Sequence, residues 1–146
     1  AQLLCSLPWY PNGIGFGLES DVVYVASTGE HQIWRFPITG DGLGRPEVFV
    51  QMDHGLPDGF AFDVTGNLIL AAPGHDGRTG EIQTYDPNGD LIDTFMPGSS
   101  IKYTNVALSA DRTLVITDAD GGSVLAVSDW PTAGIALYPF CVELKS

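Results

Sequence analysis

Two copies of one hexad carry an amide and a carboxylate at the same position. Residues 11–16 read PNGIGF and residues 57–62 read PDGFAF, so Asn12 and Asp58 lie 46 residues apart. Amide and carboxylate oxygens are the ligands that hard cations such as Ca²⁺ prefer. Such hexads are also common turn sequences, because Pro presets φ and Gly supplies a positive φ. Two interpretations remain open, a cation site and a pair of turns, and the recurrence of the hexad in register favours the cation site.

A third, degenerate copy continues this spacing. Residues 103–108 read YTNVAL, and Leu108 follows Phe62 by 46 residues, as Phe62 follows Phe16. Further short apolar runs follow each hexad and are bounded by Gly, Asp, Asn or Pro, which is typical of strands and tight turns. The last of these runs is the weakest and covers residues 135–140. The pattern predicts an all-β repeat protein whose unit of about 45 residues is a four-stranded β-propeller blade.

The repeat divides the chain into three predicted blades at residues 11–56, 57–102 and 103–146, with residues 1–10 as the outer strand of a preceding blade. Three blades cannot close a ring, since propellers need roughly four to eight. We expect half of a six-bladed propeller. The remaining half would be a cleaved segment of the same protein, a separate subunit or a second copy of this chain, and the sequence leaves all three open.

Composition and charge exclude several classes of partner. The formal net charge of -12 argues against nucleic acid and anionic membranes as partners. No apolar run approaches the roughly 18 residues of a transmembrane helix, and the first residues lack the basic region of a signal peptide, so we expect a soluble protein of undetermined compartment. Cys5 and Cys141 match no metal motif. Two separate thiols are expected, with a disulfide across a two-fold ring as the alternative.

Propeller geometry gathers polar residues at one end of the central axis. The innermost strand comes first in each blade, so the residues that begin these strands should converge on one face. These residues are Asn12, Asp58, Thr104 and Asn105. His54 lies just ahead of Asp58 and is a candidate substrate contact on the same face. Two protein ligands are too few for a tight cation site, because Ca²⁺ takes roughly six to eight oxygens.

The order of these motifs resembles the senescence marker protein, gluconolactonase and luciferin-regenerating enzyme family. The resemblance is carried by residues 11–14, 23–26, 29–36, 40–44, 57–59, 104–107 and 117–122. It extends over nearly the whole chain but corresponds only to the C-terminal half of the family's six-bladed propeller. Members of the family are mostly metal-dependent hydrolases of sugar lactones and related esters.

The resemblance implies one catalytic divalent cation on the axis, most often Ca²⁺, with Zn²⁺, Mn²⁺, Fe²⁺ or Mg²⁺ as alternatives. Asn12 and Asp58 match two of its protein ligands, and the third, a Glu, belongs to the half that this chain lacks. Asp58 is expected to act as a ligand first and as a base for water second. Asn105, Thr104 and His54 are the expected substrate contacts. The alternative is a non-catalytic propeller module with a structural cation or none.

Overall fold

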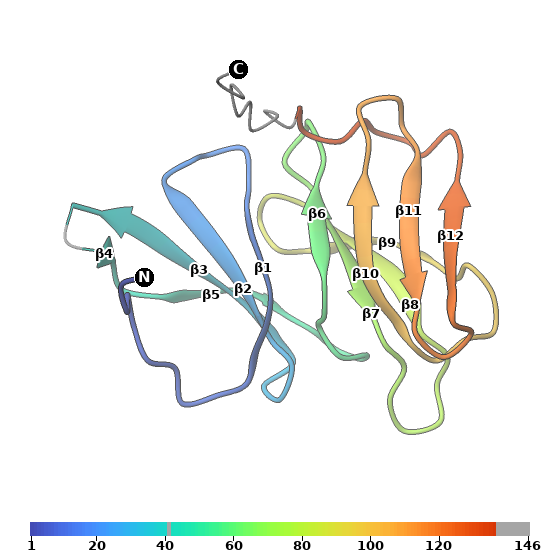
Figure 1. Cartoon of the computed structure of the whole chain (residues 1–146), viewed down its shortest axis with the longest axis horizontal. Coiled ribbons are helices and arrows are strands. Elements are labelled where there is room, and N and C mark those ends of the chain that lie inside the picture. The colour runs from blue at the N-terminus through green and yellow to red at the C-terminus, as the bar shows by residue number, and fades with distance from the viewer. Residues whose placement is uncertain (41, 137–146) are drawn as a thin grey trace, which may run out of the picture.

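The computed structural model describes residues 1–40 and 42–136, whose strands form three antiparallel sheets (Figure 1). The first sheet contains β1 (Pro11–Phe16), β2 (Val22–Ser27), β3 (Gln32–Thr39) and β5 (Glu47–Gln51), with the short β4 (Gly42–Leu43) beside the end of β3. The second contains β6 (Phe60–Phe62), β7 (Leu68–Ala72), β8 (Glu81–Tyr85) and β9 (Leu91–Phe95). The third contains β10 (Tyr103–Leu108), β11 (Leu114–Asp118) and β12 (Ser123–Val127).

This architecture confirms the prediction of an all-β partial propeller. Each sheet is an up-and-down series whose first strand lies beside the first strand of a neighbouring sheet, as β1, β6 and β10 do. The described residues contain no helix that is long and apolar enough to cross a membrane. Most of the predicted run at residues 135–140, like Cys141, lies outside the described residues.

The opening segment differs from its prediction in one respect. Residues 1–10 form no strand and instead lie against the exposed face of the first sheet. A strand needs a neighbouring strand for its hydrogen bonds, and the described residues offer this segment none. Its assignment to a preceding blade stays a prediction.

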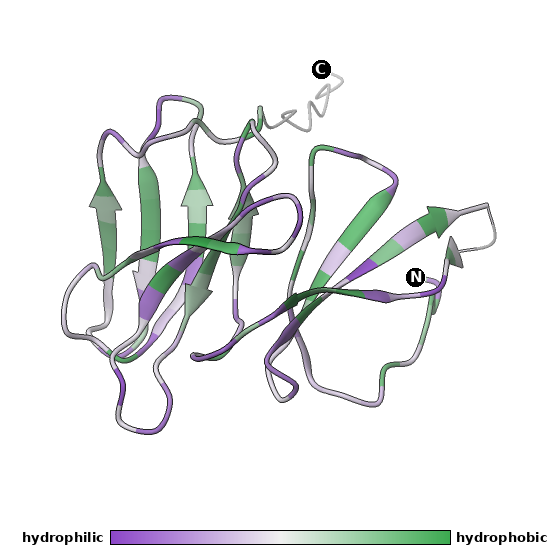
Figure 2. Ribbon diagram, turned by 180° about the vertical axis from the view of Figure 1, so that it is seen from behind, coloured by the Kyte–Doolittle hydropathy of each residue, from purple (hydrophilic) through white to green (hydrophobic). Residues whose placement is uncertain are grey.

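Adjacent sheets pack face to face through apolar side chains. The sequence of β7 is apolar without interruption because both of its faces are covered. All five of its residues are buried. Leu68, Leu70 and Ala72 pack toward the first sheet, whereas Ile69 and Ala71 pack toward the third. Each fully buried Leu or Ile contributes roughly 1.5–3 kcal/mol relative to an exposed one. Figure 2 shows that the strands are largely hydrophobic and that the turns joining them are more polar.

A buried carboxylate holds the turn between β6 and β7, at the end of the blade opposite the candidate site. Asp63 is fully buried and accepts hydrogen bonds from the backbone and side chains of Thr65 and Asn67 and, at 2.6 Å, from Thr132 Oγ1. Burial acts to raise the pKa of Asp63, but these hydrogen bonds outweigh it and lower the pKa below its ordinary value. Thr132 thereby ties the segment after β12 to the second sheet.

Candidate functional site

A β-bulge stands where the innermost strand of each blade begins. The pairing of β1 with β2 shifts register between residues 11 and 14, and that of β10 with β11 shifts between residues 103 and 105. In the second blade, the Asp58 N–H and the Gly59 carbonyl both bond to Ala71, at 3.2 Å and 2.9 Å. A bulge places two residues opposite one and re-aims a side chain. The three bulges therefore set the direction of the side chains around the axis.

The three polar side chains at these bulges meet around one cavity. Its volume is about 460 Å³, and it is lined by Asn12, Gly13, Ile14, Asp58, Gly59, Phe60, Asn105 and Val106. These residues come from the first strands of all three blades and the residues just before them. The structure thus brings Asn12, Asp58 and Asn105 together as the repeat predicted, and their roles stay predictions.

Two glycines allow the neighbouring blades to approach this closely. A Cβ at Gly13 would lie 2.3 Å from the carbonyl oxygen of Asp58, and one at Gly59 would lie 2.0 Å from Oδ1 of Asn105. Neither glycine has a positive φ, so they are required for space and not for a left-handed turn. A turn that needs a positive φ therefore does not explain why these two positions are glycine. The walls of the cavity can form only because Gly13 and Gly59 carry no side chain.

The electrostatics of the cavity favour a positively charged ligand. Burial raises the pKa of Asp58 above its ordinary value and outweighs the opposing influence of the neighbouring Asn12 amide and Gly59 N–H. None of the residues that line the cavity in the described part of the chain is basic. A half-buried carboxylate without a cationic neighbour is stabilised in its charged form when a cation binds beside it.

Two other predicted site residues do not line the cavity. The Thr104 hydroxyl shares a 3.0 Å hydrogen bond with the Thr117 hydroxyl, because the bulge gives the axial position to Asn105. The Thr104 carbonyl instead accepts the Gly59 N–H at 2.9 Å and joins two blades. His54 donates from Nε2 to the Glu81 carboxylate at 2.5 Å. The substrate contacts assigned to Thr104 and His54 stay predictions, made by residues that do not line this cavity.

One residue at the site was not foreseen from the sequence. Thr28, in the turn after β2, accepts a hydrogen bond from Asn12 Nδ2 at 3.2 Å and donates to the Pro57 carbonyl at 2.9 Å. These partners lie 16 and 29 residues away along the chain. No local sequence pattern could have revealed these two contacts, because both join segments far apart in the chain.

The residues present fit a hard cation. Among the described residues no group of three or more His, Cys, Asp or Glu side chains could hold a metal. The donors around the cavity are instead one carboxylate and two amides, which suit Ca²⁺, Mg²⁺ or Mn²⁺ better than the imidazole and thiolate sites of softer metals. Asn105 Oδ1 accepts the Val106 N–H at 2.9 Å, so Asn12 Oδ1 and the Asp58 carboxylate are the first candidates as ligands.

Comparison with known families identifies the chain. A family model described as the SMP-30/Gluconolactonase/LRE-like region matches residues 6–120. The chain belongs to this family. The matched residues include Asn12, Asp58 and Asn105, and the membership confirms the resemblance drawn from the motifs.

Relatives within the SMP-30/gluconolactonase/LRE-like family include lactonases. A 6-deoxy-6-sulfogluconolactonase of Pseudomonas putida is 30% identical over 155 residues, covering 98% of this chain and 52% of that protein. The structure of a gluconolactonase from Xanthomonas campestris matches with a TM-score of 0.63 and 27% identity, over 75% of this chain and 35% of that one. A calcium-binding regucalcin from Agrobacterium tumefaciens, at TM-score 0.65 and 24% identity over 80% and 45%, shares the fold. The chain spans about half the length of the Pseudomonas relative.

Proposed function

We propose that the chain is part of a divalent-metal-dependent hydrolase that opens sugar lactones or related esters. The main support is the placement of Asn12 and Asp58 on one cavity at the propeller axis. Two relatives of the chain, from Pseudomonas and Xanthomonas, are named as lactonases. The calcium-binding regucalcin supports the fold, and its name makes Ca²⁺ the first cation to test.

The cation would be held by Oδ1 of Asn12 and the carboxylate of Asp58. Gly13 and Gly59 allow the first strands of neighbouring blades to approach closely beside these ligands, and burial raises the pKa of Asp58. Further oxygens, including the family's Glu, would come from the remaining half of the ring and from water. Ca²⁺ is our first choice, with Zn²⁺, Mn²⁺, Fe²⁺ or Mg²⁺ as alternatives.

The chemistry that such a cation supplies when bound is polarisation of the lactone carbonyl and stabilisation of the oxyanion formed when water adds. Asp58 serves first as a ligand and second as an acceptor for the proton of the attacking water. Asn105, whose Oδ1 accepts the Val106 N–H, would donate from Nδ2 to a hydroxyl of the substrate. Phe60 lines both this cavity and the apolar space beside it, where its ring would limit the access of water.

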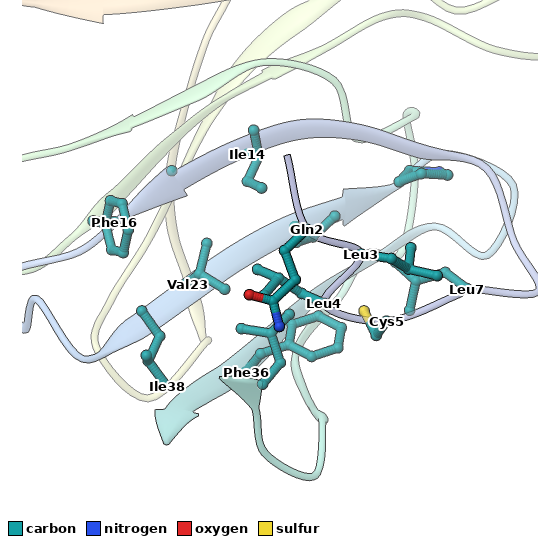
Figure 3. Close-up of a pocket in the computed structure, with 14 residues that line it drawn as sticks. Gln2, Leu3, Leu4, Cys5, Leu7, Ile14, Phe16, Val23, Phe36 and Ile38 are labelled. Atoms are coloured by element: carbon teal, nitrogen blue, oxygen red, sulfur yellow. The ribbon is translucent and has the colours of Figure 1, made fainter. Parts of the chain in front are cut away.

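The remaining half of the propeller would cover the open face of the first sheet. Ile14 and Phe16 are 70% and 57% exposed there. Figure 3 shows that face, with Leu3 and Leu4 of the opening segment lying across part of it. Exposed apolar faces of this kind mark surfaces that pack on a partner. We propose that the partner is the other half of the ring, supplied as a cleaved segment, a second subunit or a second copy.

Native mass measurement combined with metal analysis would identify that partner and the ion together. Lactonase activity would be followed with a pH indicator on glucono-δ-lactone, using the chain with whatever completes its ring. We expect Asp58→Ala to lose both the metal and the activity while the β-sheet circular dichroism is retained. Asp120→Ala, an exposed carboxylate outside the cavity, is the control.

Full activity in Asp58→Ala would overturn the assignment. A stable, metal-free form of the chain without lactonase activity would instead favour the non-catalytic propeller module.

A further inference from the structure

The hydroxyl of Thr28 is hydrogen-bonded to one candidate ligand, Asn12, and to the residue just before the other, Asp58. It donates to the Pro57 carbonyl at 2.9 Å and accepts from Asn12 Nδ2 at 3.2 Å. Asn12 belongs to the first blade and Pro57 leads into the second. One side chain therefore spans the boundary between the two blades that carry the ligands.

The first of these hydrogen bonds determines how the second must run. A hydroxyl has one hydrogen to donate, and a carbonyl oxygen can only accept, so the hydrogen of Thr28 is committed to Pro57. Toward Asn12 the hydroxyl can then only accept, which requires the NH₂ group of the amide to face Thr28. The Asn12 Oδ1 is consequently turned away from Thr28 and left open as a donor to a cation.

The same hydroxyl also fixes the peptide that carries Asp58. The Pro57 carbonyl belongs to the peptide group whose N–H is that of Asp58, and this N–H bonds to the Ala71 carbonyl at 3.2 Å. Thr28 and Ala71 therefore hold the two ends of one peptide plane. The backbone N–H of Thr28 bonds in turn to the Tyr10 carbonyl at 3.3 Å, just before Asn12.

We propose that Thr28 is a positioning residue for the cation site. It orients the amide oxygen of Asn12 and the backbone of Asp58 through one hydroxyl and so sets the separation of the two ligands. This role rests on the proposed function for its cation. Partners that orient metal ligands typically change metal affinity by about 10–100-fold when they are removed.

The test compares Thr28→Val, which removes the hydroxyl at similar shape, with Thr28→Ser, which keeps it. Mn²⁺ alone serves as the probe, because its paramagnetic broadening of the Gly13 and Gly59 amide signals in NMR reports even weak binding. We expect Thr28→Val to weaken Mn²⁺ binding about 10–100-fold and Thr28→Ser to restore most of it. Thr79→Val is the matched control, since Thr79 lies in the turn between β7 and β8, as Thr28 lies in the turn between β2 and β3, and it contacts Met96 Sδ at 3.8 Å, away from the cavity.

A second readout does not depend on the cation. The side-chain NH₂ signals of Asn12, assigned by comparison with Asn12→Asp, should be protected from solvent exchange in the wild type and in Thr28→Ser but not in Thr28→Val. Unchanged Asn12 signals in Thr28→Val would overturn the positioning role, as would unchanged Mn²⁺ affinity. If no variant and no wild type binds Mn²⁺, the proposed cation site fails, and the Asn12 signals still decide the role of Thr28.

Discussion

Replacing Gly13 by Ala tests whether contact between neighbouring blades builds the cavity. The added Cβ would lie 2.3 Å from the Asp58 carbonyl oxygen and 3.1 Å from both the Asp58 carbonyl carbon and Gly59 Cα, whereas ordinary contacts begin near 3.4 Å. All three atoms belong to the backbone, so no side chain can turn aside. The first strands of the two blades must therefore separate by about 1 Å, a shift of the size known to cost catalytic sites about 10²-fold in rate.

The energetic consequence follows from two opposed effects. Overpacking lowers the free energy of unfolding by about 1–3 kcal/mol. The reduced conformational freedom of the unfolded chain raises it by about 0.4–1 kcal/mol. We expect a net loss of roughly 1–2 kcal/mol, or about 3–8 °C in Tm for a chain of this size. The same separation moves Asn12 away from Asp58 and weakens Mn²⁺ binding.

The assay is thermal and urea unfolding followed by far-UV circular dichroism, together with Mn²⁺ titration. Gly29→Ala is the control, because a Cβ there meets no atom within 4 Å and φ is not positive. We expect this control to keep or slightly raise the stability of the protein. If Gly13→Ala melts as high as Gly29→Ala and keeps its Mn²⁺ affinity, the close approach of the blades does not define the site.

Two further predictions concern Asp63 at the opposite end of the blade. Asp63→Ala leaves five hydrogen-bond donors without their acceptor. We expect urea unfolding to show a loss of about 3–4 kcal/mol in the free energy of unfolding. Hydrogen bonds to charged groups contribute roughly 1.5–3 kcal/mol each, and water replaces part of them in the turn. Asp86→Ala, in the equivalent but exposed turn, should lose less, and equal losses would argue against burial as the cause. Because the pKa of Asp63 is lowered on folding, its contribution is present above the ordinary Asp pKa of 3.8 and is lost as the pH falls through the folded value. Urea midpoints at pH 6 and pH 3 should therefore differ less in Asp63→Asn than in the wild type, and an equal difference would contradict this sign.

The fold and the place of the site could be predicted because they depend on spacing. A repeat of 46 residues fixes which residues begin the innermost strands, and the uninterrupted apolar run of β7 predicts a strand covered on both faces. The convergence of Asn12 and Asp58 follows from that spacing without any knowledge of their contacts.

The finer assignments depended on contacts that no local pattern contains. Thr104 and Asn105 are neighbours in sequence, and only the register shift at the bulge decides that Asn105 faces the cavity. His54 lies four residues before Asp58, yet its ring is held by Glu81, 27 residues further along the chain. Gly13 and Gly59 follow residues typical of turns, but their role is to admit the backbone or side chain of the next blade.

The bulge at the start of each blade lets the polar side chain at that position change while the strand pairing behind it is kept. Each of the three bulges presents one side chain to a shared space, and these side chains are an amide, a carboxylate and an amide. The strands behind them keep their pairing whichever polar group stands there, because the bulge is a property of the backbone. After duplication of an ancestral blade, such positions could diversify independently, so that a new metal or substrate preference required single substitutions and no new fold.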